Sequence, residues 1–275
     1  MFSVPTIAAL ADAIQVAMGG DGQVQAELAT VTAGEWIVRS DVRPDARTRL
    51  FCFPFAGGGA SAFRDWSRLF PADIEICAIQ LPGREERMRE PLVTEMSVLV
   101  DSLVEALAAY QDKPFAFLGH SMGAVVCFEL ARRLRATGQR LPAHLFLSAR
   151  AAPHLDSPDS GLKDLSDDEF MERLHSLYGA VPSAIRDSVD LQQLFLPVLK
   201  ADVTLLETYA YVPDAPLDCG ITALGGEQDP AISANMLAAW RQHTSTEFLQ
   251  RAFPGNHFYI VDARQAVANT VLERL

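Results

Sequence analysis

Short apolar runs alternate with helical patterns along most of this chain. Six runs have the length of strands that are buried on both faces, and they fall at residues 50–53, 74–81, 115–118, 145–148, 221–224 and 248–253. Apolar residues at helical spacing lie between them, in a stripe over 98–107, in a helix that ends before Gly138, and in a last helix from about Tyr259. This alternation predicts a largely parallel sheet with helices packed on both faces.

The alternation stops between residues 151 and 217. The pattern there is mostly helical, with helices expected over 167–178 and 190–211, and prolines interrupt it at positions 153, 158, 182 and 213. We interpret this segment as an insertion between two strands that forms a helical lid. The rest of residues 46–275 is expected to form the sheet domain, and a short strand is expected around Trp36.

Charge and composition narrow the class of protein. The 275 residues are 49% apolar and carry a net charge of −12, which argues against nucleic acid or an anionic membrane as a partner. The sequence shows neither an apolar run that could span a bilayer nor the pattern of a secretory signal. Its four cysteines are scattered, without a histidine at metal-ligand spacing. We therefore expect a cytoplasmic protein with reduced thiols and no metal or cofactor of its own.

One motif predicts a nucleophile. Gly119-His120-Ser121-Met122-Gly123 matches G-x-S-x-G, and it lies between an expected buried strand and an expected helix. This is the position of a nucleophile elbow, a sharp turn that presents a serine hydroxyl at the carboxyl edge of a sheet. The alternative is an ordinary strand-to-helix turn with a small residue. The context favours Ser121 as a nucleophile.

A serine hydroxyl needs a base within hydrogen-bond reach to act as a nucleophile at neutral pH. Where this elbow occurs, the order along the chain is serine, acid, histidine. Among six histidines, His257 follows the last expected strand. Asp229 follows the preceding strand and is the predicted acid, with Glu227 as its rival and Asp262 as a weaker one. The acid would fix the imidazole tautomer and stabilise the imidazolium.

A glycine-rich loop at residues 53–59 follows the first strand of the sheet domain. Its backbone could donate an N–H to an oxyanion, and we predict Ala56 as this donor. The second donor would be the N–H of Met122, the residue after the nucleophile. A phosphate-binding loop is excluded, because the sequence contains neither G-K-[ST] nor G-x-G-x-x-G.

Two arginine clusters remain. Arg84, Arg87 and Arg89 follow a strand, and a second group lies near a helix end, at Arg132, Arg133, Arg135 and Arg140. Such clusters usually form a solvated face and suit a helix end. On an acidic protein they are also the place where a more acidic partner would dock.

Several segments, taken in order, resemble the type II thioesterases of polyketide and nonribosomal peptide synthesis. They are residues 53–58 (FPFAGG), 80–85 (QLPGRE), 119–123 (GHSMG), 147–153 (LSARAAP), 206–209 (LETY), 216–219 (PLDC), 225–229 (GGEQD) and 255–259 (GNHFY). So many ordered matches are far more specific than G-x-S-x-G alone.

This resemblance implies an α/β-hydrolase fold with a helical lid over the active site. It implies a substrate whose acyl group is held as a thioester on the phosphopantetheine arm of a carrier protein. It also supports Ser121, Asp229 and His257 as the catalytic triad, and the N–H groups of Ala56 and Met122 as the oxyanion hole.

The first part of the chain departs from this resemblance. Free-standing members of the family begin shortly before the 53–58 segment, and residues 4–11 resemble the last helix of a carrier domain. We therefore expect residues 1–20 to be a carrier remnant, residues 21–45 a linker and first strand region, and residues 46–275 a thioesterase domain excised from a larger synthase. In that arrangement an acyl- or peptidyl-carrier domain is joined in cis, and the enzyme releases its finished chain.

Four alternatives to hydrolytic release stay open. An editing thioesterase would remove aberrant acyl groups from carriers. A macrocyclising enzyme would use a hydroxyl or amine of the substrate in place of water. A generic carboxylesterase of the same fold would prefer oxygen esters, and a catalytically silent domain would only bind carriers.

Overall fold

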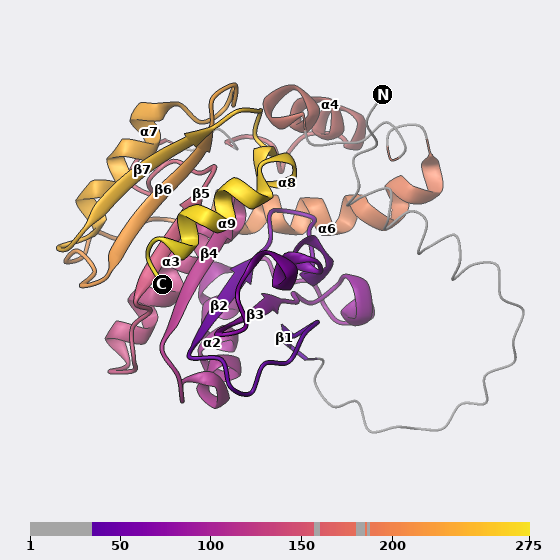
Figure 1. Ribbon diagram of the computed structural model, residues 1–275. Coiled ribbons are helices and arrows are strands. Elements are labelled where there is room, and N and C mark those ends of the chain that lie inside the picture. Colours follow the sequence, from indigo (N-terminus) through magenta and orange to yellow (C-terminus); the bar gives the residue numbers. More distant parts are fainter. Residues whose placement is uncertain (1–34, 157–159, 180–184, 186–187) are drawn as a thin grey trace, which may run out of the picture.

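A single sheet forms the centre of the molecule (Figure 1). The computed structural model describes residues 35–156, 160–179, 185 and 188–275, and within them the sheet has seven strands in the order β1-β3-β2-β4-β5-β6-β7. They are β1 Ile37–Val38, β2 Thr48–Phe53, β3 Ile74–Ile79, β4 Phe115–His120, β5 His144–Ser148, β6 Gly220–Gly226 and β7 Phe248–Phe253. β1 pairs antiparallel with β3, and the other neighbours are parallel. The expected carrier remnant, residues 1–20, lies outside the described residues.

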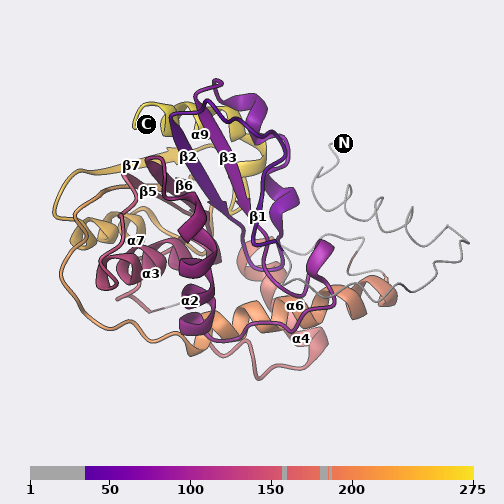
Figure 2. The same ribbon diagram turned by 90° about the horizontal axis from the view of Figure 1, so that it is seen from below.

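Helices cover both faces of this sheet, as Figures 1 and 2 show. They are α2 Met96–Leu107, α3 Met122–Ala136 and α7 Ala234–Ala238, with α8 Tyr259–Asp262 and α9 Arg264–Leu272 on the other face. Alternate side chains of β2 serve the two faces: Phe51 and Phe53 pack with α2 and α3, whereas Leu50 and Cys52 pack with α9. Burial on both faces explains why these strands are continuous apolar runs in the sequence. Short 3₁₀ helices lie in the connections, at Ala60–Phe63, Trp66–Leu69, Glu85–Arg87, Ala108–Tyr110 and Ala239–His243.

The six predicted strands are confirmed, with ends that move by up to two residues. β6 is longer than predicted because Gly225 and Gly226 still pair with β7. The strand expected around Trp36 is the edge strand β1, which lies in the segment predicted to contain the linker and the first strand. The last helix is not continuous, because Ala263 interrupts it between α8 and α9.

The insertion between β5 and β6 contains two longer helices, α4 Asp167–Tyr178 and α6 Val189–Thr208. α4 begins with a capping box, in which the Ser166 and Glu169 side chains each accept the other's backbone N–H. α6 contains Pro197 within its length. The two helices pack on each other through an apolar cluster that includes Phe170 and Val203 (Figure 2). α4 has the predicted bounds, whereas α6 ends three residues before the predicted end at position 211.

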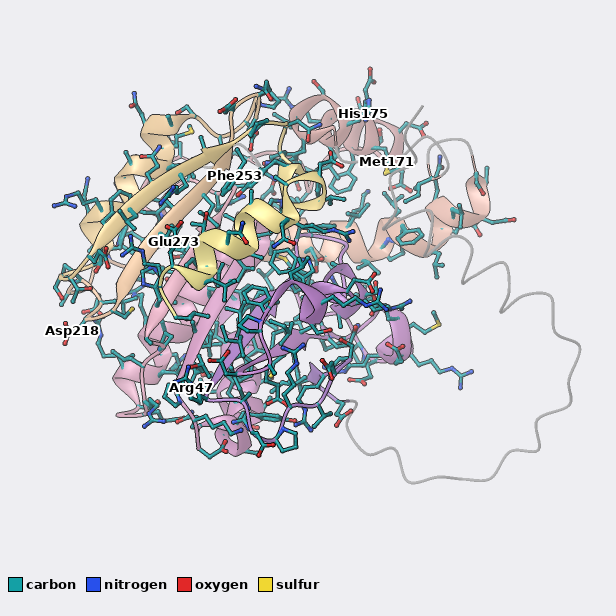
Figure 3. The ribbon with its side chains drawn as sticks, in the orientation of Figure 1. Arg47, Met171, His175, Asp218, Phe253 and Glu273 are labelled. Carbon is teal, nitrogen blue, oxygen red and sulfur yellow. The ribbon has the colours of Figure 1, made fainter. Side chains whose placement is uncertain are left out.

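The carboxyl ends of the parallel strands face the insertion. In Figure 3, Phe253 at the end of β7 lies toward Met171 and His175 of α4, whereas Arg47 and Asp218, which precede β2 and β6, lie at the opposite end. The loops that follow β2, β4, β6 and β7 therefore come together on the side of the insertion. Ligands of open α/β sheets bind at this edge, and these loops carry the residues that the sequence analysis selects.

Candidate active site

Ser121 lies in the turn between β4 and α3. Its backbone has φ 54° and ψ −114°, a combination that non-glycine residues rarely adopt, and its N–H donates to the carbonyl of Ser148 at the end of β5 (N···O 2.8 Å). Gly123 permits close packing behind the turn, because a Cβ there would lie 2.3 Å from the carbonyl oxygen of Phe53. The turn thus has the strained geometry of a nucleophile elbow.

Three side chains from separate loops form one hydrogen-bonded chain. Ser121 Oγ lies 3.0 Å from His257 Nε2, and His257 Nδ1 lies 2.7 Å from Asp229 Oδ2. Asp229 Oδ1 accepts the backbone N–H groups of Ala231 and Ile232 at 2.9 and 3.2 Å, which fixes the carboxylate. The His257 and Asp229 side chains are 2% and 0% exposed. With its Nδ1 proton donated to the acid, His257 offers Nε2 as an acceptor to the serine hydroxyl.

The two rival acids lie elsewhere. Glu227 is exposed, and its carboxylate accepts a long hydrogen bond from Gln228 Nε2 at 3.5 Å. Asp262 is exposed at the end of α8. The structure therefore brings Ser121, His257 and Asp229 together and leaves Glu227 and Asp262 outside.

His120, next to the serine, belongs to a different network. Its Nδ1 lies 2.7 Å from Ser148 Oγ, which in turn lies 2.6 Å from the hydroxyl of Tyr259. Burial, and next the nearby His257, hold the pKa of His120 well below its usual range, and burial raises the pKa of Tyr259. Both groups are therefore neutral near pH 7, and His120 supports the floor of the site without joining the proton-transfer chain.

The predicted oxyanion donors lie on two segments that touch. Met122 is the first residue of α3, and N–H groups of a first helical turn have no acceptor within the helix. Ala56 lies in a four-residue turn that the N–H of Gly58 closes by donating to the carbonyl of Phe55 at 2.9 Å. Gly57 has φ 77°, as the third residue of a type II turn requires. The contact of Gly123 with the backbone that precedes this turn brings both segments to the same edge.

The insertion contacts this site at two places. The ring of Tyr178, the last residue of α4, lies 4.5 Å from the ring of His257, centroid to centroid. On α6, Leu199 packs over the turn at Gly57, because a Cβ on that glycine would lie 2.6 Å from Leu199 Cδ2. The insertion thus borders both the predicted base and the predicted oxyanion loop.

The prediction for the first arginine cluster is wrong for two of its members. Arg84 and Arg87 are only 7% and 4% exposed, so they are no docking surface. Arg84 forms a two-pronged ion pair with Asp202 of α6, with N···O distances of 2.6 and 2.8 Å. Arg87 pairs with Glu90 at 2.6 Å. Arg89 is exposed, as expected.

Sequence reasoning missed Asp202. This carboxylate lies in a part of α6 where Val198, Val203 and Leu205 are all buried. Charged residues are almost never fully buried unless they are paired, so an aspartate in this apolar pattern was the available signal. Its partner could not be read, because Arg84 is 118 positions away in the sequence.

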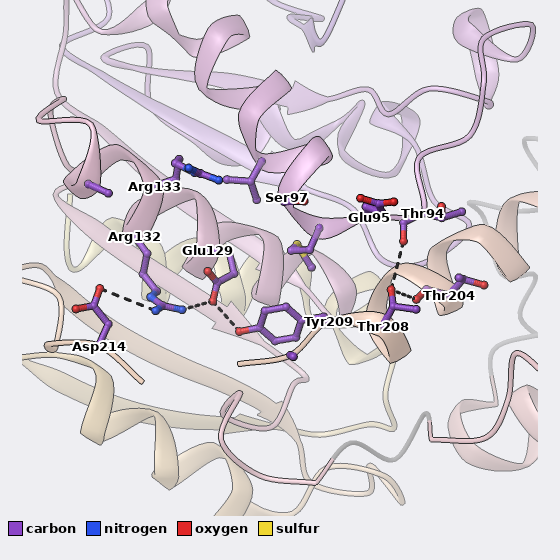
Figure 4. Close-up of a pocket in the computed structure, with 14 residues that line it drawn as sticks. Thr94, Glu95, Ser97, Glu129, Arg132, Arg133, Thr204, Thr208, Tyr209 and Asp214 are labelled. Atoms are coloured by element: carbon purple, nitrogen blue, oxygen red, sulfur yellow. Dashed lines mark hydrogen bonds and ion pairs between the residues drawn. The ribbon is translucent and has the colours of Figure 1, made fainter. Parts of the chain in front are cut away.

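A separate cavity of about 700 Å³ lies between α2, α3 and the end of α6 (Figure 4). Its polar groups bond to one another: Arg132 donates to Glu129 at 2.6 Å, and the Tyr209 hydroxyl donates to the same carboxylate at 2.6 Å. Arg132 and Arg135 also pair with Asp214. Docking of an acidic partner on the second arginine cluster stays a prediction, and much of that cluster's charge is already balanced within the chain.

Neither a metal site nor a membrane-spanning helix is found in the described ranges. They contain no group of three or more histidine, cysteine, aspartate or glutamate side chains that could hold a metal ion. None of the helices described there is both long and apolar enough to cross a membrane.

Known proteins of one family match this chain. A family model described as the thioesterase domain matches residues 48–275. The chain belongs to this thioesterase family. Over 241 residues it is 40% identical to the gramicidin S biosynthesis protein GrsT of Aneurinibacillus migulanus, a match that covers 88% of this chain and 94% of GrsT.

Solved structures of such thioesterases have the same fold. RedJ, a thioesterase from the prodiginine biosynthetic pathway in Streptomyces coelicolor, matches with a TM-score of 0.80 at 35% identity, over 90% of this chain and 97% of RedJ. YbtT, a type II thioesterase from the yersiniabactin NRPS/PKS pathway, matches with a TM-score of 0.78 at 30% identity, over 87% and 97%. The predicted type II thioesterase relationship and the α/β-hydrolase fold are both confirmed.

Proposed function

We propose that this thioesterase hydrolyses the thioester that joins an acyl, polyketide or peptidyl chain to the phosphopantetheine arm of a carrier protein, with Ser121 as the nucleophile. The observation that carries the proposal is the hydrogen-bonded chain from Ser121 through His257 to Asp229, buried at the carboxyl edge of the sheet. The family supports a carrier-bound thioester as the substrate.

Acylation is the first step. Ser121 Oγ attacks the thioester carbonyl carbon while His257 Nε2 takes the hydroxyl proton, and Asp229 stabilises the imidazolium that forms. The carbonyl oxygen becomes an oxyanion that accepts hydrogen bonds from the N–H groups of Ala56 and Met122. When this intermediate collapses, the C–S bond breaks and His257 returns its proton to the departing sulfur, so the phosphopantetheine thiol leaves.

Deacylation regenerates the enzyme. Water donates a proton to His257 as its oxygen attacks the acyl carbon, and the same N–H groups bind the second oxyanion. The bond to Ser121 Oγ then breaks, His257 protonates the serine, and the chain leaves as a carboxylic acid. A hydroxyl or amine of the substrate in place of water would give a ring, which is the macrocyclising alternative.

The carrier and the compartment are further parts of the proposal. Residues 4–11, outside the described residues, resemble a carrier helix, and on that basis we propose that the carrier is joined in cis and that the enzyme releases a finished chain. Four buried free cysteines support a reducing, cytoplasmic setting. Intact-protein mass spectrometry of carriers loaded with long or short acyl chains separates release from editing: faster loss of short aberrant groups would favour editing.

The nucleophile is tested by Ser121→Ala. Turnover of an acyl-pantetheine thioester should fall by on the order of 10⁴-fold or more, because no other group can form the acyl intermediate. The control is Ser97→Ala on the exposed start of α2, which should keep full turnover. Labelling by a fluorophosphonate, mapped by mass spectrometry, should occur at Ser121 in the wild type. Full turnover by Ser121→Ala would refute the assignment, and faster cleavage of oxygen esters than thioesters would favour a carboxylesterase.

The acid is tested by two changes in one loop. Asp229→Asn should lower kcat by about 10⁴-fold, because the imidazole loses the partner that sets its tautomer. Glu227→Gln alters an exposed carboxylate two positions away and should leave kcat unchanged. A larger loss in Glu227→Gln would show that the acid is misassigned.

A further inference from the structure

We propose that Asp202 of α6 is a positioning residue for the oxyanion site, because it holds the turn that carries the Ala56 N–H. The inference rests on the proposed function, in which that N–H binds the oxyanion. It adds that the site is complete only while α6 is seated on the 53–59 loop.

Both carboxylate oxygens of Asp202 accept hydrogen bonds at this contact. Oδ2 accepts the backbone N–H of Gly57 at 2.7 Å and Arg84 Nη1 at 2.6 Å, and Oδ1 accepts Arg84 Nη2 at 2.8 Å. The side chain is 2% exposed. A buried carboxylate that lost these donors would find little water to replace them, so the arrangement is strongly preferred over any that separates the three groups.

The hydrogen bond to Gly57 fixes a peptide group that the turn itself leaves unpaired. The turn at 55–58 is closed by the N–H of Gly58, its fourth residue. The N–H of Gly57 belongs to the central peptide, which directly follows Ala56 and is free to rotate in an isolated turn. By accepting that N–H, Asp202 fixes the backbone on the carboxyl side of Ala56. The hydrogen bond between Phe55 and Gly58 fixes it on the amino side.

The segment at residues 80–85 holds the end of the loop and the 3₁₀ helix that follows it. Arg84 Nη1 also donates to the carbonyl of Gly58 at 3.3 Å. Gln80 Oε1 accepts the N–H of Ala60 at 2.9 Å, and the Glu85 carboxylate accepts the hydroxyl of Ser61 at 2.5 Å. Arg84 therefore contacts both the loop and α6, and its guanidinium links the two.

α6 contacts the turn with two side chains of one helical face. Leu199 and Asp202 are three positions apart, a spacing that places them on the same side of a helix. Leu199 covers Gly57, where any Cβ would collide with it, and Asp202 binds the N–H of the same residue. A shift of α6 would thus move the turn or break both contacts.

The test is Asp202→Asn, which keeps the shape and removes the charge. We expect kcat to fall by about 10- to 100-fold, with KM within about twofold, because a donor misplaced by about an ångström weakens transition-state binding. The rate constant for fluorophosphonate labelling of Ser121 should fall in parallel, while the final stoichiometry of labelling stays at the wild-type value. A merely structural role would lower the stoichiometry and leave the rate constant of the folded fraction unchanged.

The matched control is Glu75→Gln, which alters a buried carboxylate paired with Arg49 at the amino end of the sheet. It should leave kcat per labelled site unchanged. A kcat for Asp202→Asn within about twofold of wild type would overturn the inference, as would an equal loss in Glu75→Gln.

A second variant covers the case in which Asp202→Asn does not fold. Arg84→Lys keeps the positive charge but cannot form the two-pronged pair and the bond to Gly58 together. It should also lower kcat, by several-fold, with KM unchanged, and wild-type kcat would overturn the inference. Failure of the proposed function has a different signature, because the wild type itself would then not be labelled at Ser121 or would cleave oxygen esters faster than the acyl-pantetheine thioester.

Discussion

Two buried arginine–carboxylate pairs lie at opposite ends of the sheet. Arg49 and Glu75 are cross-strand partners at the starts of β2 and β3, 2.9 Å apart, and Glu75 also accepts the backbone N–H of Arg43 at 3.1 Å. Arg84 and Asp202 lie beyond the carboxyl ends, 2.6 Å apart. The two carboxylates are 1% and 2% exposed.

The same chemistry has different consequences at the two ends. The Glu75 pair joins strands that already share a ladder of backbone hydrogen bonds, so its loss weakens the fold without moving any reacting group. The Asp202 pair joins segments that no ladder connects, a loop of the sheet domain and a helix of the insertion. Its loss should therefore change the geometry of the site as well as stability. Variants in which a loss of stability is measured separately from a loss of turnover therefore distinguish the Glu75 pair from the Asp202 pair.

The largest expected change in stability follows Glu75→Ala. Arg49 would lose its buried partner and keep only its ion pair with Asp112, whose side chain is 58% exposed, so the free energy of unfolding should fall by about 3 kcal/mol. Urea denaturation followed by circular dichroism measures this change. Turnover per labelled Ser121 should stay at the wild-type value. A drop in that ratio would mean that the amino end of the sheet also shapes the site, and the contrast with Asp202 would fail.

Gly57→Ala should disturb the turn at residues 55–58, beyond the carboxyl end of the sheet. An alanine at this positive φ costs roughly 1–2 kcal/mol of stability. Its Cβ would also lie 2.6 Å from Leu199 Cδ2. We expect lower kcat together with this loss of stability. Adding Leu199→Ala removes the collision and should recover part of kcat, as steady-state kinetics on an acyl-pantetheine would show. No recovery in the double variant would argue that α6 does not set the position of the turn.

A smaller effect appears on acidification. Burial opposes ionisation of Glu75, but the hydrogen bonds from Arg49 and from the Arg43 N–H, with the nearby positive charges, outweigh it and lower the pKa of this carboxyl below its usual 4.5. Its contribution to stability is therefore complete above pH 4.5 and is lost as the pH falls through the lower folded pKa. The gap in unfolding free energy between wild type and Glu75→Gln should narrow in that range. A constant gap would contradict the assignment.

The smallest effect is expected for an exposed pair. Arg68 and Asp65 lie 3.3 Å apart with 82% and 54% of their side chains exposed, and such pairs contribute little because water and salt screen them. Asp65→Ala should change neither the urea midpoint nor kcat beyond experimental error. A measurable loss in either would show that burial is not what separates the three pairs.

Much of this architecture was readable from the sequence, for physical reasons. Strands buried on both faces leave continuous apolar runs, and α4 was predicted with its true bounds because its apolar stripe lies between a capping serine and Gly179. Ser121, His257 and Asp229 were selected because chain order and strand ends constrain where such residues lie. Their meeting within hydrogen-bond distance is seen only in the structure.

The linkage between α6 and the oxyanion loop was not readable. Arg84 was interpreted as a surface charge, because arginines in a polar loop are usually solvated. The role of Asp202 was not predicted, because the sequence around a single carboxylate in a helix does not indicate which residue pairs with it. The break at Ala263 was missed for a similar reason, since nothing in the local pattern forbids a continuous helix there.

Pro197 divides α6 into two parts that differ in their exposure to solvent. It lacks an N–H and its ring crowds the carbonyl of Gln193, so the helical ladder is interrupted just before Leu199 and Asp202. The part before it exposes Val189 and Leu194 to solvent, at 67% and 38%. Residues 189–196 include no buried side chain, whereas Val198 and Asp202 beyond the proline are buried. Substitutions before the proline should leave the contacts of Leu199 and Asp202 with the 53–59 loop intact.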